Sequence, residues 1–210
     1  DYTVFVHEYG IASMSSGFTV GGYGTYHSVY DSYYTMSTFV DPEYHLASGS
    51  AQIVGLLGFE IANNDLIPFN LYNLYDRLHD FVNDIDQLQI EYDCNVNEID
   101  PDLENVLIGG IENYGDAALR FDEAVDALLD MDEDERDDNY DQLVRDYNFV
   151  MRTAGSKLLY SDGLPTRKIF KNLIVAAAVD NGYGEQILPY IGYVIKFDCA
   201  NTELLQQAYN

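Results

Sequence analysis

Residues 71–88, LYNLYDRLHDFVNDIDQL, carry the clearest structural pattern of this chain. Their apolar side chains recur at alternating steps of three and four residues, at Leu71, Leu74, Leu78, Phe81, Ile85 and Leu88. This spacing places them on one face of an α-helix, whereas a half-buried strand would alternate at every second residue. The segment therefore predicts an amphipathic helix with one apolar seam that packs against other helices.

Neighbouring segments repeat this pattern. Small and apolar residues step in the same way over residues 47–61, and Pro68 interrupts the chain before the next helix. A third helix is expected over residues 100–128 and a fourth over residues 140–158, each with apolar residues near one face. Consecutive amphipathic helices with short connections are typical of antiparallel bundles. The predicted fold class is therefore mainly α.

Other segments predict smaller features. The β-branched and aromatic run 2–6 predicts a buried strand, and Asp41-Pro42 is expected to start a helix with Asp as its cap. Gly115 and the pair Gly109-Gly110 predict a kink or a close helix crossing in the third helix. Residues 173–179 fit either a strand or a buried helix. A last helix is expected over residues 189–208.

Acidic residues dominate the charge of this chain of 210 residues. It carries 36 Asp and Glu against 10 Lys and Arg, which gives a net charge of −26 and a pI near 4.1. Such a surface repels phosphate backbones and anionic headgroups, which argues against nucleic-acid and acidic-membrane partners. Adaptation to high salt and solubility in a secreted or vacuolar protein both fit this composition. No apolar run is long enough to predict a membrane segment.

Neither the acidic run nor the two cysteines fit a known metal-binding motif. The acidic run 130–138 spaces its aspartates like a calcium loop, but Glu135 stands where glycine is required and Asp141 where glutamate is required. A solvated turn between helices is the better interpretation. Cys94 and Cys199 lack metal-ligand spacing, and whether they pair stays open. The chain begins without an initiator Met, so we expect a piece of a longer protein.

One histidine stands in a different context from the others. His27 lies in GGYGTYHSVYDSYY, residues 21–34, whereas His7, His45 and His79 have no spacing that converges on a metal. A zinc-bound imidazole is usually oriented by an acceptor on its other nitrogen, and Asp31 is in reach along the chain. Tyr26 precedes the imidazole and can donate its hydroxyl to an oxyanion. One histidine without a second ligand is a weak signal by itself.

Several ordered motifs together resemble a known peptidase family. They are DYTVFVHEYGIAS at 1–13, YHSVYDSYY at 26–34, FVDPEYHLASGSAQIVGLL at 39–57, GLPTRKIFKNLIVA at 163–176 and GYGEQILPYIGYVI at 182–195. These blocks resemble the C-terminal third of the zinc peptidases related to glutamate carboxypeptidase II and the transferrin receptor. The helices between the blocks are similar in pattern rather than in letters.

The resemblance implies a layout and a metal site. Residues 1–42 would close an α/β zinc-peptidase domain, and residues 43–210 would form a helical domain through which members form homodimers. His27 would correspond to the last zinc ligand and Tyr26 to the tyrosine that stabilises the tetrahedral intermediate, with Asp31 orienting the imidazole. Two zinc ions and a glutamate base complete such a site. The other ligands would lie upstream of this chain, so the chain alone is expected to be inactive.

The resemblance also implies a substrate loop. Gly182 and Tyr183 match the positions of a Lys-Tyr pair that binds the substrate carboxylate in glutamate carboxypeptidases. The lysine is replaced here, so a broader di-zinc exopeptidase is expected rather than a glutamate-specific enzyme. The resemblance favours an extracellular or vacuolar/lumenal compartment, and the residues themselves leave the compartment open. Two alternatives stay open: a receptor-like relative without zinc, and a free-standing helical interaction module.

Overall fold

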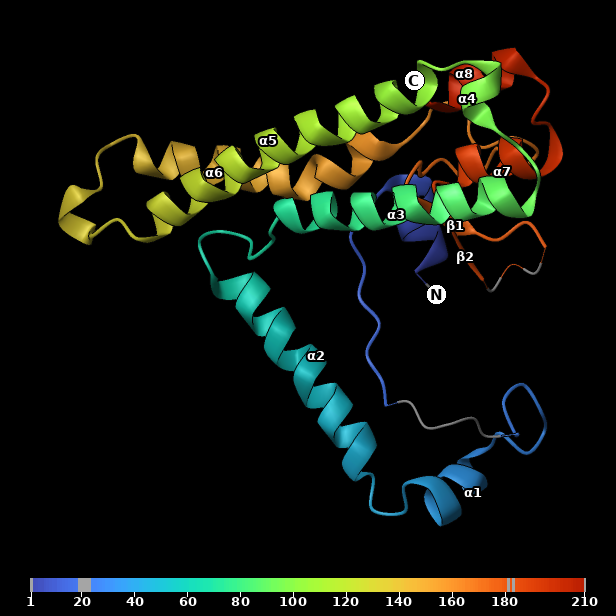
Figure 1. The fold of residues 1–210 in the computed structure, drawn as a ribbon. Helices are drawn as coiled ribbons and strands as arrows, with labels where there is room; N and C mark the ends of the chain where they lie inside the picture. Colours follow the sequence, from blue (N-terminus) through green and yellow to red (C-terminus); the bar gives the residue numbers. More distant parts are fainter. Residues whose placement is uncertain (1, 19–23, 181, 183, 210) are drawn as a thin grey trace. The chain divides into compact units, whose positions relative to one another are not determined.

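The computed structural model describes residues 2–18, 24–180, 182 and 184–209, and it divides into two units (Figure 1). The main unit contains residues 1–13 and 69–210, and the small unit contains residues 14–68. The helices of the main unit are α3 (Tyr72–Glu91), α4 (Val96–Ile99), α5 (Leu103–Leu129), α6 (Tyr140–Thr153), α7 (Pro189–Phe197) and α8 (Thr202–Tyr209). This content confirms the mainly α class.

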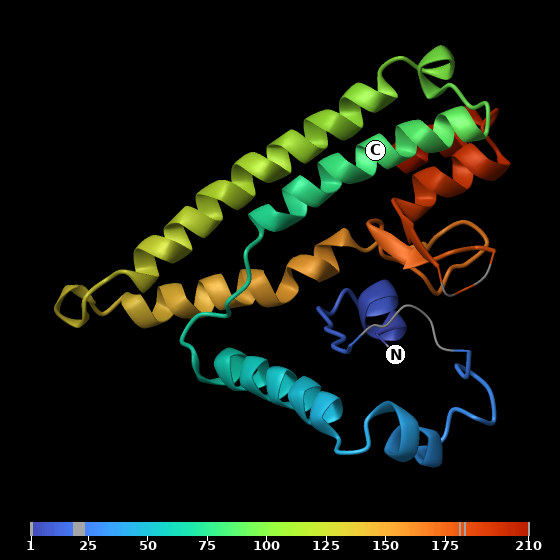
Figure 2. The ribbon, with the colours of Figure 1, turned by 60° about the horizontal axis from the view of Figure 1, so that its bottom comes forward.

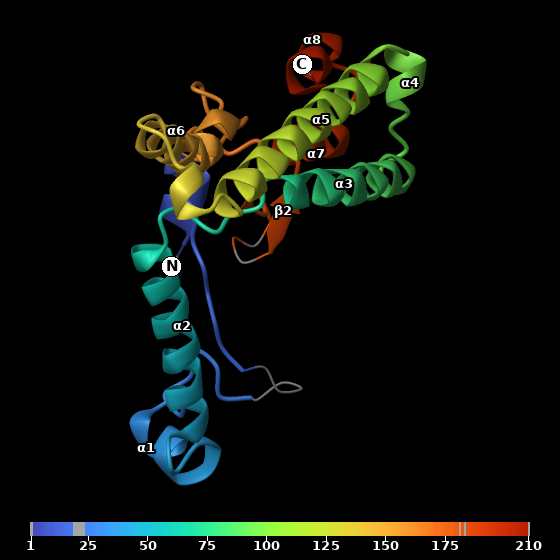
Figure 3. The same ribbon diagram turned by 90° about the vertical axis from the view of Figure 1, so that its left-hand side faces the viewer.

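Helices α3 and α5 form the centre of the main unit, and α7 packs against α3 (Figures 1 and 3). The predicted seam of α3 is buried at Leu78, Phe81 and Ile85. These side chains share one core with Ile111 of α5, Ile191, Val194 and Ile195 of α7 and Leu205 of α8. Removal of this apolar surface from water is the main force that holds the helices together.

A buried carboxylate fixes the start of α3 on α5. Asp122 of α5 is 8% exposed and accepts the backbone N–H groups of Leu71 and Tyr72, at 3.1 and 2.8 Å. The first N–H groups of a helix have no partner within the helix, and a negative charge there is stabilised by the helix dipole. Tyr114 Oη adds a hydrogen bond of 2.7 Å to the carbonyl of Leu71. Burial raises the pKa of Tyr114 to about 12.

The predicted close crossing occurs at Gly115. A methyl group at this position would lie 2.3 Å from Cδ2 of Tyr75 on α3, so only glycine leaves room for the ring. Helix α5 continues to Leu129 and α6 returns antiparallel to it, with Phe121 and Tyr147 in edge contact (Figure 2). Their connection contains the exposed acidic run and the short turn η3 (Glu133–Glu135), as the inter-helix interpretation expects.

The second half of the main unit contains the β structure. Strands β1 (Val175–Ala177) and β2 (Glu185–Ile187) pair antiparallel with Val175 opposite Ile187. The ambiguous segment 173–179 therefore contains a strand. The short helix η4 (Ala154–Leu158) extends α6. The last predicted helix is in fact two helices, α7 and α8, because a turn closed by the Asn201 N–H and the Asp198 carbonyl separates them.

The strand predicted for residues 2–6 is wrong. Residues Val4–Glu8 form a π-helical turn, η1, with Val4 and Phe5 about half exposed. Its backbone bonds are local, since the N–H of Val6 donates to Tyr2 and that of Ile11 to Phe5. A strand needs a partner along its whole edge. Here the neighbouring segment instead sends the N–H groups of residues 171 and 172 to the single carbonyl of His7.

The small unit contains α1 (Tyr33–Thr35), the π-helical turn η2 (Met36–Val40) and α2 (His45–Asn63). Helix α2 begins later than Asp41-Pro42 predicts. The N-cap is Tyr44 and not Asp41 as predicted, and Pro42 lies outside the helix; Asp41 contributes from three residues before the cap, because its Oδ2 accepts the N–H of Ala47 at 2.9 Å. The expected domain boundary at residue 42 falls within this unit and stays a prediction. Among the described helices, none is long and apolar enough to cross a membrane.

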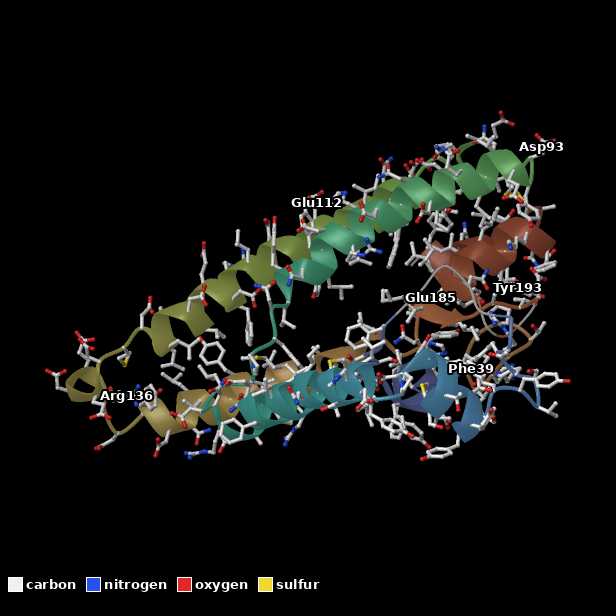
Figure 4. All side chains as sticks on the ribbon, turned by 90° about the horizontal axis from the view of Figure 1, so that it is seen from below. Phe39, Asp93, Glu112, Arg136, Glu185 and Tyr193 are labelled. Carbon is white, nitrogen blue, oxygen red and sulfur yellow. A yellow bond between two sulfur atoms is a disulfide. The ribbon has the colours of Figure 1, made fainter. Side chains whose placement is uncertain are left out.

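A disulfide connects Cys94 and Cys199, with 1.99 Å between the sulfur atoms. Cys94 follows α3 and comes directly after Asp93, which is labelled in Figure 4. Cys199 lies between α7 and α8. The sequence left this pairing open. The fold settles it, because packing of α7 against α3 brings the two Cα atoms to 5.9 Å.

Candidate functional site

Tight turns hold the Tyr26-His27 pair in the small unit. The Ser28 hydroxyl donates to the Thr25 carbonyl at 2.7 Å and accepts the N–H of Tyr30 at 3.1 Å. His27 adopts a left-handed conformation, with φ of 60°. Its imidazole stacks on the Tyr26 ring with 3.9 Å between centroids and 20° between planes. The turns thus present an imidazole and a phenol side by side on an exposed loop.

Asp31 belongs to the same series of turns. Its backbone N–H donates to the Ser28 carbonyl at 3.1 Å, and its side chain is exposed. The chain then enters α1, where the Ser32 hydroxyl caps the N–H of Thr35 at 3.3 Å. Asp31 is therefore held one turn beyond His27. That it orients the imidazole stays a prediction.

The described part of the chain does not complete a zinc site. Structural and catalytic zinc ions take three or four ligands from His, Cys, Asp or Glu side chains. Within the described residues, no group of three such side chains could hold a metal ion. His27 has the chemistry of a zinc ligand but supplies a single donor. No catalytic step through zinc follows from this chain alone.

The predicted substrate loop connects the two strands of the main unit. Gly182 is exposed and left-handed, with φ of 69°, and its N–H donates to Ala178 at 3.2 Å. The loop is closed at its base by the N–H of Ala178, which donates to the carbonyl of Gly184 at 2.7 Å. Tyr183 lies outside the described residues. Its predicted contact with a substrate carboxylate therefore stays a prediction.

Arg167 holds the two strands that flank this loop, and the sequence analysis did not identify this role. Its guanidinium donates to the carbonyl of Ala177 and, at 3.3 Å, to Oε1 of Gln186, so it connects both strands of the hairpin. It also lies over the Phe170 ring at 5.5 Å. In the sequence, Arg167 stands out only as the arginine of the GLPTRK block. Its role is seen only once the strands have paired.

The other histidines lie in three separate environments. His45 begins α2 and is exposed. His79 on α3 is partly exposed, with Nε2 3.1 Å from a carboxylate oxygen of Glu112, which agrees with the expected surface position. His7 is buried, and its ring makes edge contacts with Tyr2 and Phe170. These environments explain each residue by packing or by surface position.

Comparison with known proteins identifies the family. Residues 105–209, half of the chain, match the transferrin receptor-like dimerisation domain. The chain belongs to this family. The matched region contains all but the first two residues of α5, and the whole of α6, the hairpin with its loop, α7 and α8. The match confirms the predicted resemblance to this dimerisation domain over residues 105–209, and the expected bounds 43–210 stay a prediction.

Relatives of this family connect the chain to peptidases. Across its full length it is 31% identical to a probable glutamate carboxypeptidase of Arthroderma benhamiae, of which it covers 28%. It is 27% identical over 90% of its length to the probable glutamate carboxypeptidase LAMP1 of Arabidopsis thaliana, covering 25%. Over 39% of its length it is 27% identical to the aminopeptidase NAALADL1 of Mus musculus, covering 12%. The chain spans about a quarter of the two carboxypeptidases, and it is a member of a peptidase family.

Proposed function

We propose that this chain is the C-terminal part of a longer di-zinc exopeptidase and that His27 provides one of its zinc ligands. The observation that carries the proposal is the exposed Tyr26-His27 pair, held on structured turns in a chain whose full-length match is a probable glutamate carboxypeptidase. Both side chains are exposed, so residues from another segment of a longer protein can reach them. A site completed by residues outside the chain would explain this exposure.

The proposed roles follow from the chemistry of the side chains. One imidazole nitrogen of His27 binds zinc, and Asp31 accepts from the other nitrogen and orients the ring. The Tyr26 hydroxyl donates to the oxyanion that develops on the substrate carbonyl. Zinc, when bound, would polarise the carbonyl group of the substrate and activate a water molecule for attack. The remaining ligands and the general base come from outside the chain, so the chain alone is inactive.

We propose further that the loop at Gly182 and Tyr183 binds the free end of a peptide. The phenol of Tyr183 donates to a terminal carboxylate, and the left-handed Gly182 gives the loop its turn. No lysine accompanies the tyrosine at this position, in contrast to the pair of glutamate carboxypeptidases. A peptide with a range of terminal residues is therefore the proposed substrate, and the helical domain provides a homodimer interface.

The test uses the full-length peptidase with three variants. His27→Ala is expected to lose about one zinc per chain and to slow peptide hydrolysis by more than about 100-fold, because losing a ligand costs more than losing the group that orients it. Tyr26→Phe keeps its zinc and loses turnover. His45→Ala, another exposed histidine of the same unit, is the control and stays like the wild type.

Zinc content by mass spectrometry and initial rates on end-blocked and free peptides separate the outcomes. Wild-type zinc and activity in His27→Ala would overturn the role of His27. A wild-type protein that neither holds zinc nor cleaves peptides would instead favour a receptor-like relative that keeps the fold.

A further inference from the structure

The disulfide connects three helix ends that are far apart in sequence. Cys94 follows α3, Cys199 lies between α7 and α8, and 105 residues separate them. Lys196 in the last turn of α7 lies 5.3 Å from the ring of Tyr92, the residue that ends α3. The covalent bond and this cation–π contact therefore join the same two regions.

We propose that the Cys94–Cys199 disulfide is a redox-sensitive latch that holds α8 in place. Helix α8 spans Thr202–Tyr209, only eight residues. Isolated helices of this length are unstable in water, so α8 depends on its attachments. The disulfide lies three residues before Thr202, the first residue of α8, and restrains the start of the helix.

The anchor on the α3 side is rigid. Cys94 is 1% exposed, and its N–H donates to the carbonyl of Gln89 at 2.9 Å. The side chain of Gln89 accepts the N–H of Val96 at 2.9 Å, and Val96 is itself buried. The sulfur of Cys94 thus belongs to a turn that is fixed from both sides.

The other attachments of α8 are noncovalent. Leu205 and Tyr209 are buried in the core, Gln207 accepts the Tyr190 hydroxyl at 3.1 Å, and Gln206 donates to Asp100 at 3.2 Å. The bond between Gln206 and Asp100 is exposed and contributes little to stability, while the bond between Tyr190 and Gln207 is partly buried. With the disulfide open, these hydrogen bonds, the burial of Leu205 and Tyr209 and the partial burial of Leu204 and Ala208 have to hold an eight-residue helix.

Reduction would begin at the more accessible sulfur. Cys199 is half-buried, whereas Cys94 is enclosed. A thiolate of a dithiol attacks Sγ of Cys199, the S–S bond breaks, and Cys94 leaves as a thiolate that takes up a proton. The second thiol of the reductant then displaces Cys199, so the protein gains two electrons and two protons while the dithiol becomes a cyclic disulfide. The acidic side chains Asp86, Asp93 and Glu104 line a hollow beside Cys94 and repel anionic thiols.

The redox environment of the protein decides whether the latch is closed. Both cysteines of the chain are used in the bond, so no thiol is left for metal binding or catalysis. Disulfides of this kind persist in secreted and lumenal proteins and are rare where glutathione keeps thiols reduced. This inference rests on the bond and its place in the fold, and it is independent of the proposed peptidase activity.

Hydrogen exchange of the full-length protein with and without dithiothreitol tests the latch. Amides of residues 202–209 are expected to exchange at least about 100-fold faster after reduction, while those of α3 and α5 change little. In the double variant Cys94→Ala/Cys199→Ala, these amides should exchange as fast as in the reduced wild type, and dithiothreitol should not change their rates. Gln206→Ala, which keeps the disulfide and loses one hydrogen bond, is the matched control and should stay protected.

Two results would overturn the proposal. One is unchanged protection of α8 in the fully reduced wild type, which can be measured even where the double variant does not fold. The other is mass spectrometry of the natively purified protein showing two free thiols. Activity is not used as a readout, so failure of the latch and failure of the peptidase assignment are distinguishable.

Discussion

At the scale of single residues, His7 is the buried ionisable group with a direct consequence for stability. It is 3% exposed, and its Nδ1 atom is buried without a hydrogen-bond partner among the described residues. Burial lowers the pKa of His7, the carboxylate of Glu185 raises this pKa again in part, and the guanidinium of Arg167 lowers it. The neutral imidazole is therefore the form that the fold accepts.

This position predicts a loss of stability in mild acid. The unfolded chain takes up a proton on His7 as the pH falls below about 6.5, while the folded chain resists it. The contribution is fully present above that pH and declines below it, by at most about 1.4 kcal/mol per pH unit. His7→Phe keeps an aromatic ring between Tyr2 and Phe170 and should flatten the decline.

Denaturant midpoints between pH 7.5 and 5.5 provide the measurement. His45→Phe, at an exposed position, should keep the slope of the wild type. An equal slope in His7→Phe would contradict the assignment to His7.

The sequence predicted some residues of the candidate site and missed others. His27 and Tyr26 were singled out by their neighbours in the sequence, and the structure shows them stacked on exposed turns. The role of Arg167 could not be predicted, because its partners, Ala177 and Gln186, lie next to it only after the hairpin has formed.

At the scale of elements, the crossing of α3 and α5 depends on one glycine. Gly109 and Gly115 lie in the same helix, but a methyl group at Gly109 would have no neighbour within 4 Å, while one at Gly115 would meet the Tyr75 ring. Glycine within a helix costs about 1 kcal/mol relative to alanine, so both positions oppose helix formation. Packing compensates for this cost only at Gly115.

Alanine at the two positions should have opposite effects. Gly109→Ala is expected to raise the free energy of unfolding by about 1 kcal/mol, because helix propensity improves and no clash follows. Gly115→Ala is expected to lower the free energy of unfolding by about 1–3 kcal/mol, because the new methyl group would clash with Cγ, Cδ2 and Cε2 of the Tyr75 ring. Chemical denaturation of the two variants decides the matter. Equal stabilisation of both would mean that the crossing is not tight.

At the scale of the whole molecule, charge opposes the assembly that the family implies. Carboxylates outnumber Lys and Arg by 36 to 10, and two copies would bring together twice a charge of −26. The dimerisation-type domain matched over residues 105–209 includes the acidic run between α5 and α6. Salt screens such repulsion, with a Debye length near 30 Å at about 0.01 M and 3 Å at about 1 M.

Dimerisation is therefore expected to strengthen with salt. Light scattering coupled to size exclusion should show a growing dimer fraction as NaCl is raised from about 0.01 to 1 M, since screening lowers the repulsion. Sucrose is the control, because it favours compact states without screening charge. A monomer at every salt concentration would contradict the homodimer proposal.

The sequence by itself determined the long helices of the main unit and the buried face of α3, whereas the apolar face expected over residues 47–61 is exposed in α2. The steps of three and four along residues 71–88 required an amphipathic helix, and Leu78, Phe81 and Ile85 are indeed buried. Such patterns are local, so they can be followed without knowing the fold. The same holds for the acidic turn between α5 and α6.

Only the tertiary structure decided what depends on contacts between distant residues. Residues 2–6 have the composition of a strand, yet no partner edge is offered to them, and they form the turn η1 instead. The pairing of Cys94 with Cys199 required α7 to pack on α3, and the cap of α3 by Asp122 spans fifty residues of sequence. Backbone and sulfur partners of this kind are chosen by the packing of helices, because the apolar seams, and not the polar groups themselves, set which segments meet.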